Sequence, residues 1–513
     1  MKRSFLLLVA FLLLMVHSCR KQDTASSPEI MTKPDPTLLD QFIREKMESQ
    51  GQFLWSWASD EQIWTALANA DFVLSVGYRP GGEENVEDRL HLLDIQSPDW
   101  RAARQSLLTL ILASEQRLNP ALTETSLFAF PENDVLPVFD VFVRNPATIA
   151  AIRQLTEVRY AEPIGYEPFR KSQAADRSGS GCGYNIPSTD IVAGSDYTTI
   201  TPACKQSWNH PFHKVTEAWA NNGTGAGIGV AIIDTGCDSD QENLGSSFDQ
   251  GLSTGRTATN LVTLPQETNF WGQPVGSPET PNDPCGHGTS MQGACLGPRG
   301  TDGASVGVAY KANLVSIRAA ADVYLDESRE SVGVANAFTM AGNNPNVRII
   351  SMSMGRLNSS SQISDAVKFA YGKGKLIFCA AGTSYWWSSW FVGVIFPATM
   401  AEAIAVTGVQ DNLTSACNIC HTGSKVDFVV VMEKASNEHH PLTLADYSDD
   451  PATVGGSSVS TATTAGIAAL VWSKYPSWTR TQVLNRLKSS ANYYPGRDGS
   501  FGWGRINAQL ATQ

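Results

Sequence analysis

The chain has 513 residues, of which 42% are hydrophobic and 17% charged, so it is a globular protein too long for one ordinary core. Its formal net charge of -12 argues against nucleic acid or an anionic surface as a partner, because a phosphate-binding face needs clustered lysine and arginine. We therefore expect two folded units behind a processed N-terminus, in a soluble protein that works outside the cell.

The N-terminus predicts an export signal followed by a tether. Lys2 and Arg3 precede an apolar run from Phe5 to Val16 that is too short to span a bilayer. The run ends in Val16-His-Ser-Cys19, which resembles the lipobox of bacterial lipoproteins, although the histidine is unusual there. We expect a signal peptide over residues 1–18, lipidation of Cys19 and a polar tether over 19–37. An ordinary signal peptide with a cysteine nearby is the alternative.

Residues 38–169 predict a small α+β unit. A strand-like segment at 71–76 precedes a helical run over 100–118. The clearest elements follow, namely a strand at 138–143, a helix that Asn145 and Pro146 begin, and a strand at 158–164. A strand, a helix and a strand in so few residues suggest half of a ferredoxin-like fold.

A linker is predicted after this unit. Residues 170–181 are polar, contain glycine and show no apolar period, and exposed segments of that composition are where proteolytic nicking concentrates. We expect residues 170–206 to hold a processing linker and the start of a mature chain.

From residue 207 to the C-terminus, short β-branched runs alternate with helical windows. Continuous apolar runs are typical of strands buried on both faces of a parallel sheet, and they predict a doubly wound α/β fold. These strands are expected at residues 228–233, 314–317, 347–351, 376–379 and 403–406. Ligands of such sheets bind beyond the carboxyl ends of the strands, and Asp234 ends the first of them.

Three short segments carry an aspartate, a histidine and a serine in that order. They are Ala231-Ile-Ile-Asp234-Thr-Gly236, Gly286-His287-Gly-Thr-Ser290 and Gly455-Gly-Ser-Ser458-Val-Ser-Thr461. A serine hydroxyl becomes a good nucleophile when an imidazole, oriented by a buried carboxylate, accepts its proton. Ser458 precedes a helical window, where free N–H groups favour a developing oxyanion, and His287 opens another window whose small residues allow close approach. The three residues predict a serine peptidase.

Residues 207–513 resemble the subtilisin-like serine proteases of the subtilase family (peptidase family S8), and residues 138–164 resemble the second half of the propeptide that inhibits them. Further matches lie at residues 307–312, 350–355, 382, 396–398 and 502–507. The resemblance implies that Ser353, Met354 and Gly355 form the strand edge that pairs with a peptide substrate. It also implies that the chain's own propeptide is an intramolecular inhibitor, with its tail, residues 163–169, in the active-site cleft.

The sequence departs from the family pattern near the expected oxyanion site. The family usually carries an asparagine where this chain has Thr383, so the predicted oxyanion donors are the Thr383 side chain and the Ser458 backbone N–H. Ala462 and Thr463 replace the usual proline and histidine after the nucleophile. An aromatic segment at 385–391 falls where the family rims its specificity pocket, and it is equally typical of packing under a surface loop. We expect a slower but active enzyme.

Eight cysteines besides Cys19 are compatible with disulfides in an oxidising compartment. Because Cys237 follows Asp234 closely and Cys285 precedes His287, these two thiols are the expected disulfide. Cys295 and Cys379 fall in apolar runs and are expected to be buried thiols. The segment Cys417-Asn-Ile-Cys420-His421 fits a haem-attachment pattern, but its context favours a disulfide-bearing loop.

We expect no required cofactor and assign no metal ligand. Structural calcium is the remaining possibility, with Asn243 and the 300–305 loop as contributors. The predicted protein is a secreted, lipid-tethered precursor of a serine endopeptidase, held at a bacterial outer membrane by its lipid and periplasmic or extracellular after processing. The alternative is a catalytically weak or silent binding lipoprotein on the same scaffold.

Overall fold

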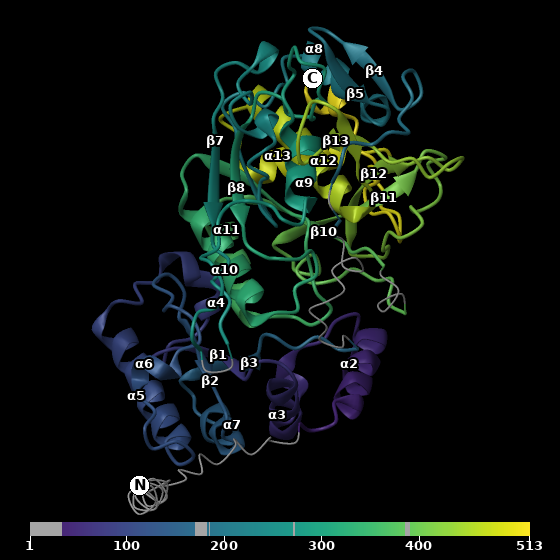
Figure 1. Ribbon diagram of the computed structural model, residues 1–513. Coiled ribbons are helices and arrows are strands. Elements are labelled where there is room, and N and C mark those ends of the chain that lie inside the picture. The colour runs from purple at the N-terminus through teal and green to yellow at the C-terminus, as the bar shows by residue number, and fades with distance from the viewer. Residues whose placement is uncertain (1–32, 170–181, 184, 270–271, 385–389) are drawn as a thin grey trace, which may run out of the picture. The chain divides into compact units, whose positions relative to one another are not determined.

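The computed structural model describes residues 33–169, 182–183, 185–269, 272–384 and 390–513 (Figure 1). The expected signal peptide, Cys19 and most of the expected linker lie outside these residues. Residues 35–513 form one compact unit. We call its described parts the N-terminal region, up to residue 169, and the C-terminal region, from residue 182. None of the described helices is long and apolar enough to cross a membrane.

The C-terminal region is built on a seven-stranded sheet with the order β12-β11-β10-β9-β6-β8-β7. All neighbouring strands are parallel, which confirms the predicted doubly wound α/β fold. The strands are β6 (Gly229–Asp234), β7 (Ala258–Val262), β8 (Asn313–Arg318), β9 (Val347–Met352), β10 (Leu376–Ala380), β11 (Ala403–Gln410) and β12 (Val426–Glu433). The five expected strands correspond to β6, β8, β9, β10 and β11, and β7 and β12 were not among them. β7 is a partly exposed edge strand with two adjacent polar residues, Thr259 and Asn260, so it is not a continuous apolar run.

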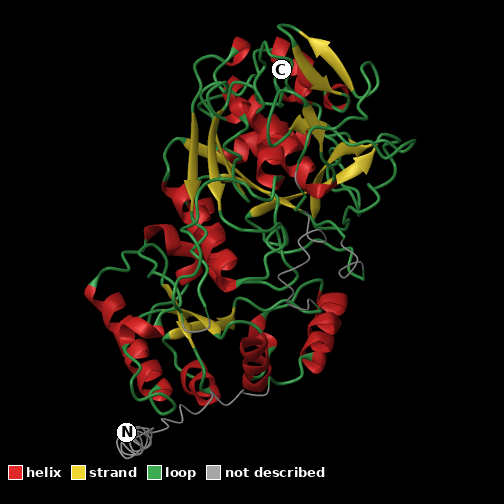
Figure 2. Ribbon diagram, in the orientation of Figure 1, coloured by secondary structure: helices red, strands yellow, loops and turns green. Residues whose placement is uncertain are grey.

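Helices cover both faces of this sheet (Figure 2). Val230 and Ile232 of β6 belong to the apolar cluster that contains α9 (His287–Leu296) and α12 (Gly456–Lys474). The alternate residues Ala231 and Ile233 face α10 (Ser328–Asn343) and α11 (Ser361–Gly372). The shorter elements are β4 (Tyr197–Ile200), β5 (Cys204–Ser207), β13 (Leu442–Leu444), β14 (Pro451–Thr453), α8 (Val215–Ala220), α13 (Arg480–Ser489) and α14 (Ala508–Ala511).

The N-terminal region has a three-stranded antiparallel sheet with the order β2-β1-β3. Its elements are α2 (Thr37–Gln50), α3 (Asp60–Asn69), β1 (Val73–Tyr78), α4 (Val86–Arg89), α5 (Pro98–Glu115), α6 (Glu124–Leu127), β2 (Val138–Phe142), α7 (Pro146–Arg153) and β3 (Val158–Pro163). The Asn145 side chain caps α7 as expected, accepting from the backbone N–H of Ala147. Where a ferredoxin-like fold would have a fourth strand, Phe128 makes a single antiparallel bridge to Val141.

The two regions meet through buried charged groups. Arg159 of β3 pairs with Asp365 of α11 at 2.8 Å, and both side chains are only 3% exposed. The Glu162 carboxylate accepts hydrogen bonds from the backbone N–H and the hydroxyl of Ser361, at the start of α11. Because a buried charge is costly once its partner is gone, these contacts fix one register of the N-terminal region on α11.

We expect Asp365→Ala to lower the free energy of unfolding by about 3 kcal/mol, because it leaves the buried guanidinium of Arg159 with a single, partly exposed carboxylate partner, Glu87. Urea unfolding of the Ser458→Ala chain with and without this substitution measures the difference. Glu48→Ala is the control, since it breaks an exposed pair with Arg44 that contributes about 0.5 kcal/mol or less. Equal losses in the two variants would contradict the expectation.

Candidate active site

Asp234 is the last residue of β6 and its side chain is completely buried. Its Oδ1 atom lies 2.7 Å from Nδ1 of His287 and also accepts the Thr235 backbone N–H at 2.9 Å. The turn after β6 and the start of α9 approach closely, since a Cβ on Gly288 would lie 2.3 Å from the Gly236 carbonyl oxygen. Glycine at position 288 is therefore what allows the carboxylate and the imidazole to meet.

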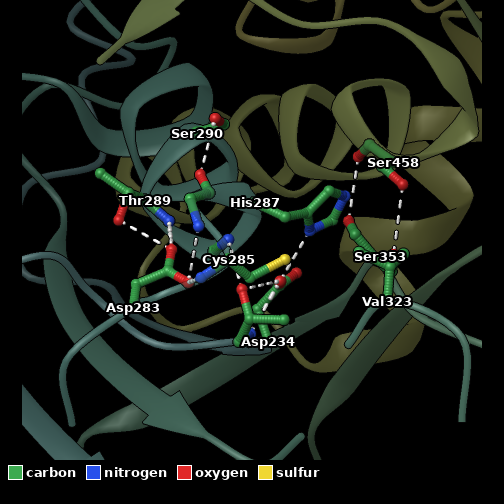
Figure 3. A network of polar contacts seen from close by, with 12 residues as sticks. Asp234, Asp283, Cys285, His287, Thr289, Ser290, Val323, Ser353 and Ser458 are labelled. Carbon is green, nitrogen blue, oxygen red and sulfur yellow. Dashed lines mark hydrogen bonds and ion pairs between the residues drawn. The ribbon is translucent and has the colours of Figure 1, made fainter. Parts of the chain in front are cut away.

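His287 is the first residue of α9, as predicted, and Asp283 fixes the turn that precedes it. One carboxylate oxygen of Asp283 accepts the backbone N–H groups of Cys285 and Gly286, at 3.2 and 3.0 Å. The other accepts the N–H and the hydroxyl of Thr289, both at 2.8 Å (Figure 3). The sequence analysis missed Asp283, although an aspartate just before a helix is a common capping signal.

The surroundings of His287 act on its pKa in opposite directions. Burial alone would lower the pKa, because it disfavours the imidazolium. The charge of Asp234 and the hydrogen bond to it raise the pKa, with smaller contributions from Asp283 and Asp322, and the net result is a pKa above the usual value. The site therefore stabilises the imidazolium that a general base becomes when it takes a proton.

Ser458 lies in the first turn of α12, as predicted. Its hydroxyl donates to the Ser353 carbonyl at 3.2 Å, and the Ser353 hydroxyl donates to the Ser458 carbonyl at 2.9 Å. Figure 3 shows the His287 ring extending from α9 toward Ser458 on the adjacent α12. The structure thus brings the three predicted residues, Asp234, His287 and Ser458, to one site.

Thr383 lies beside the start of α12. Its Oγ1 atom accepts the backbone N–H of Ser457 at 3.3 Å and lies 3.1 Å from the Ser457 hydroxyl. The Gly382 N–H also donates to that hydroxyl, at 3.2 Å. The Thr383 side chain therefore lies beside Ser457, the residue before Ser458, and its hydroxyl already has a partner there.

The Cys417–Cys420 disulfide supports this segment from the other side. Thr383 forms a β-bridge with Cys420, and the His421 N–H donates to the Gly382 carbonyl at 3.0 Å. The two ring nitrogens of His421 lie 2.8 Å from the Gly393 carbonyl and 3.1 Å from the Ser384 hydroxyl, and burial lowers the pKa of His421 to about 4. The disulfide-bearing loop is confirmed, and both thiols and the imidazole of the haem pattern have protein partners.

The expected substrate edge, Ser353 to Gly355, is already paired with another segment. Gly355 donates its N–H to the Val323 carbonyl at 3.3 Å and accepts the Leu325 N–H at 3.1 Å. Met354 is buried. An extended peptide cannot pair with Gly355 until Val323 and Leu325 release it.

The tail of the N-terminal region reaches this edge but contacts the residues that follow it. The Tyr166 carbonyl accepts from the side chains of Arg356 and Asn358, at 2.9 and 2.8 Å. Among the described residues, no hydrogen bond joins residues 163–169 to Ser353, Met354 or Gly355. The tail, expected in the cleft, therefore contacts the end of the expected substrate edge and does not pair along it, because Val323 and Leu325 occupy the pairing groups of Gly355.

The expected Cys237–Cys285 disulfide is wrong. Cys285 pairs with Cys182, which lies 103 residues earlier, at the end of the expected linker. Cys237 is a free thiol whose pKa burial raises to about 12, with smaller effects of Asp283 and Asp238. Cys295 and Cys379 are buried free thiols, as predicted.

The expected calcium contributors bind other protein groups. Asn243 donates to Asp449 at 3.0 Å and accepts from Gln250 at 2.7 Å, and Gln250 also accepts the Thr301 N–H at 3.1 Å. Within the described parts of the chain, no cluster of three or more histidine, cysteine, aspartate or glutamate side chains is suited to a metal ion.

Only the end of the aromatic segment at 385–391 lies within the described residues. Trp390 packs against Phe169 of the tail, with ring centroids 5.5 Å apart, and the Arg44 guanidinium lies 5.1 Å from its ring. Both partners belong to the N-terminal region. In this structure Trp390 therefore serves as a contact between the two regions.

Known proteins are similar to the C-terminal region of this chain. A profile of the subtilase family matches residues 225–504, which include Asp234, His287 and Ser458. Subtilisin BL of Lederbergia lenta is 29% identical over 291 residues, covering 56% of this chain and 92% of that protein. Subtilisin E of Bacillus subtilis (strain 168) is 30% identical over 297 residues, covering 56% of this chain and 67% of that protein. The crystal structure of MycP1 with its N-terminal propeptide removed aligns with a TM-score of 0.46 and 22% identity, over 60% of this chain and 96% of that one.

We expect Asp234→Asn to lower the pKa of His287, because the substitution removes the largest of the effects that raise it and leaves burial in place. NMR titration of the imidazole signals in the Ser458→Ala chain measures both values. His421 is the internal control, and its pKa should stay near 4. Because the folded pKa of His287 is raised, its contribution to stability is present at low pH and is lost as the pH rises through that pKa. An unchanged His287 midpoint would contradict this account.

Proposed function

The chain belongs to the subtilase family, and on that premise we propose that it is a serine endopeptidase that acts through Asp234, His287 and Ser458. The family relationship supports a serine peptidase. The observation that carries the assignment of residues is the 2.7 Å contact between a fully buried carboxylate and an imidazole that extends toward a serine at a helix N-terminus.

In the proposed reaction, His287 is the general base. The Ser458 hydroxyl gives up its hydrogen bond to the Ser353 carbonyl and donates to Nε2 of His287 instead. The Ser458 oxygen then attacks the scissile carbonyl while the imidazole takes its proton. The imidazolium, stabilised by Asp234, then gives that proton to the departing amine, and the C–N bond breaks. Water attacks the acyl-enzyme in the same way and releases the carboxylate product and Ser458.

The tetrahedral intermediate needs donors for its oxyanion. The Ser458 backbone N–H is one, and it lies in the first turn of α12, where the helix dipole favours negative charge. The Thr383 hydroxyl is the other candidate, but it must leave Ser457 to donate. We therefore propose a slower enzyme than one with an asparagine at this position.

The N-terminal region is the proposed intramolecular inhibitor. In support, it is bound to the C-terminal region by buried charges, and the substrate edge is closed while it is bound. We further propose cleavage within the linker at residues 170–206 and export through residues 1–18. Lipid on Cys19 would hold the precursor at a bacterial outer membrane, and processing would release the peptidase to the periplasm or the exterior.

A second candidate function is a catalytically silent binding lipoprotein. Two observations favour it: the Thr383 hydroxyl is engaged by Ser457, and the backbone of Gly355 is already paired. Labelling of the serine separates the two candidates.

A fluorophosphonate probe is expected to label the wild-type chain at Ser458, because only a serine activated by a base reacts with it. Ser458→Ala should abolish the labelling. Ser460→Ala is the matched control in the same helix, where the hydroxyl donates to the Gly456 carbonyl, and it should still be labelled. An unlabelled wild-type chain would favour the silent binding protein.

Thr383→Asn is expected to raise kcat, because an amide donor in place of the engaged hydroxyl stabilises the oxyanion. A donor of this kind contributes about 2.7 to 4 kcal/mol, so the increase is at most about 100- to 1,000-fold. Thr383→Val is the control and should not raise kcat. Peptide hydrolysis at saturating substrate provides the measurement, and a kcat for Thr383→Asn no higher than that of the wild type would refute this account of the donor.

A further inference from the structure

A carboxylate-binding site lies at the end of the expected substrate edge. Nε of Arg356 donates to Oε1 of Glu167 at 2.6 Å, and both side chains are completely buried. The other nitrogens of this guanidinium donate to the carbonyls of Ile164 and Tyr166, at 2.8 and 2.9 Å. Arg356 thus binds one acidic side chain and two backbone carbonyls from the tail of the N-terminal region.

The C-terminal region holds this arginine in place by contacts of its own. The Arg356 backbone pairs with Phe396 in both directions, at 3.0 and 3.1 Å, and its guanidinium donates to the Ser331 hydroxyl at 2.7 Å. The backbone position of Arg356 therefore depends on the C-terminal region, whereas the Ser331 hydroxyl also donates to the Ile164 carbonyl of the tail, at 3.0 Å.

Tyr324 supplies a second donor to the same carboxylate. Its hydroxyl donates to Oε2 of Glu167 at 3.0 Å and accepts the Leu357 N–H at 3.1 Å. Each oxygen of the Glu167 carboxylate therefore has its own donor, one charged and one neutral. This arrangement selects a carboxylate over an amide, because an amide offers only one acceptor oxygen and no charge.

The site lies at a definite distance from the reaction centre. Ser353, whose carbonyl accepts from Ser458, is three residues before Arg356 along one extended segment, a separation of about 10 Å. An extended peptide that pairs with this edge spans the same distance in about three residues. Its side chain three or four residues before the scissile bond would therefore lie near Arg356.

Departure of the tail would remove the main partners of the Arg356 guanidinium. Of the four hydrogen-bond acceptors described around the guanidinium, Ser331 alone belongs to the C-terminal region. An arginine stays charged at any physiological pH, so once the tail has left, the uncovered guanidinium is free to bind water or another acceptor. A carboxylate from another peptide restores what Glu167 provides.

We propose that Arg356 and Tyr324 form a subsite for an acidic side chain of the peptide substrate, and that Glu167 occupies this subsite in the precursor. The inference rests on the proposed peptidase function and names its substrate class. Glu167 also links Tyr324, in the segment that pairs with Gly355, to Arg356, next to Gly355 itself. Its departure therefore removes one link that keeps the edge closed.

The test uses the full chain after it has processed itself, with active sites counted by fluorophosphonate labelling. Fluorogenic peptides are compared in pairs that differ only by glutamate or glutamine, at each position from two to five before the scissile bond. At one position, glutamate should raise kcat/KM about 10- to 100-fold over glutamine, the range expected for a hydrogen bond to a charged group.

Two variants assign this preference to the site. Arg356→Gln should abolish it, so that kcat/KM no longer differs between the glutamate and the glutamine peptide. Arg348→Gln is the matched control near the other end of the same segment, where the side chain donates to the Pro476 carbonyl, and it should keep the preference. Tyr324→Phe should reduce the preference a few fold, which tests the site even if Arg356→Gln does not fold.

The outcomes separate the subsite from the peptidase function. A labelled wild-type enzyme that cleaves glutamate and glutamine peptides equally at all four positions overturns the subsite and leaves the peptidase intact. A preference that survives in Arg356→Gln overturns the role of Arg356. A chain that neither labels nor cleaves any peptide overturns the peptidase function itself, and the subsite with it.

Discussion

The 2.7 Å contact between Asp234 and His287 is the constraint on which the rest of the site depends. A fully buried carboxylate without a charged or hydrogen-bonding partner is costly, so the fold must bring the imidazole to it. The parallel sheet places Asp234 at the carboxyl end of a central strand, and the absence of a side chain at Gly288 lets α9 begin against the next turn. Asp283 then fixes that helix start.

The sheet could be predicted from the sequence because its central strands are continuous apolar runs, which are typical of strands buried on both faces. The positions of Asp234, His287 and Ser458 could be predicted for a related reason, since each lies at a strand end or a helix start within a short recognisable sequence motif. Contacts between segments that are distant in the sequence could not be predicted. Cys182 lies in a polar linker with no pattern that points to Cys285, and nothing in residues 323–325 predicts that they pair with Gly355.

Buried charged pairs and a shared apolar cluster both join the N-terminal and C-terminal regions. Arg159 with Asp365 and Arg356 with Glu167 are both buried pairs, and such pairs contribute to register more than to net stability. An interface with such pairs holds the two regions in one arrangement as long as both charges of each pair are present. The same charges favour separation when one partner is lost, which is consistent with the proposed release of the N-terminal region.

The Cys182–Cys285 disulfide has a consequence for the geometry of any cut between residues 170 and 181. Such a cut creates a new α-amino terminus no more than twelve residues before Cys182. The disulfide joins Cys182 to Cys285, which is two residues before His287, and so limits how far the new terminus can move from His287. The new N-terminus of the C-terminal region would thus stay near the proposed active site. In a reducing solution the Cys182–Cys285 disulfide would break, and the new N-terminus would no longer be held near His287.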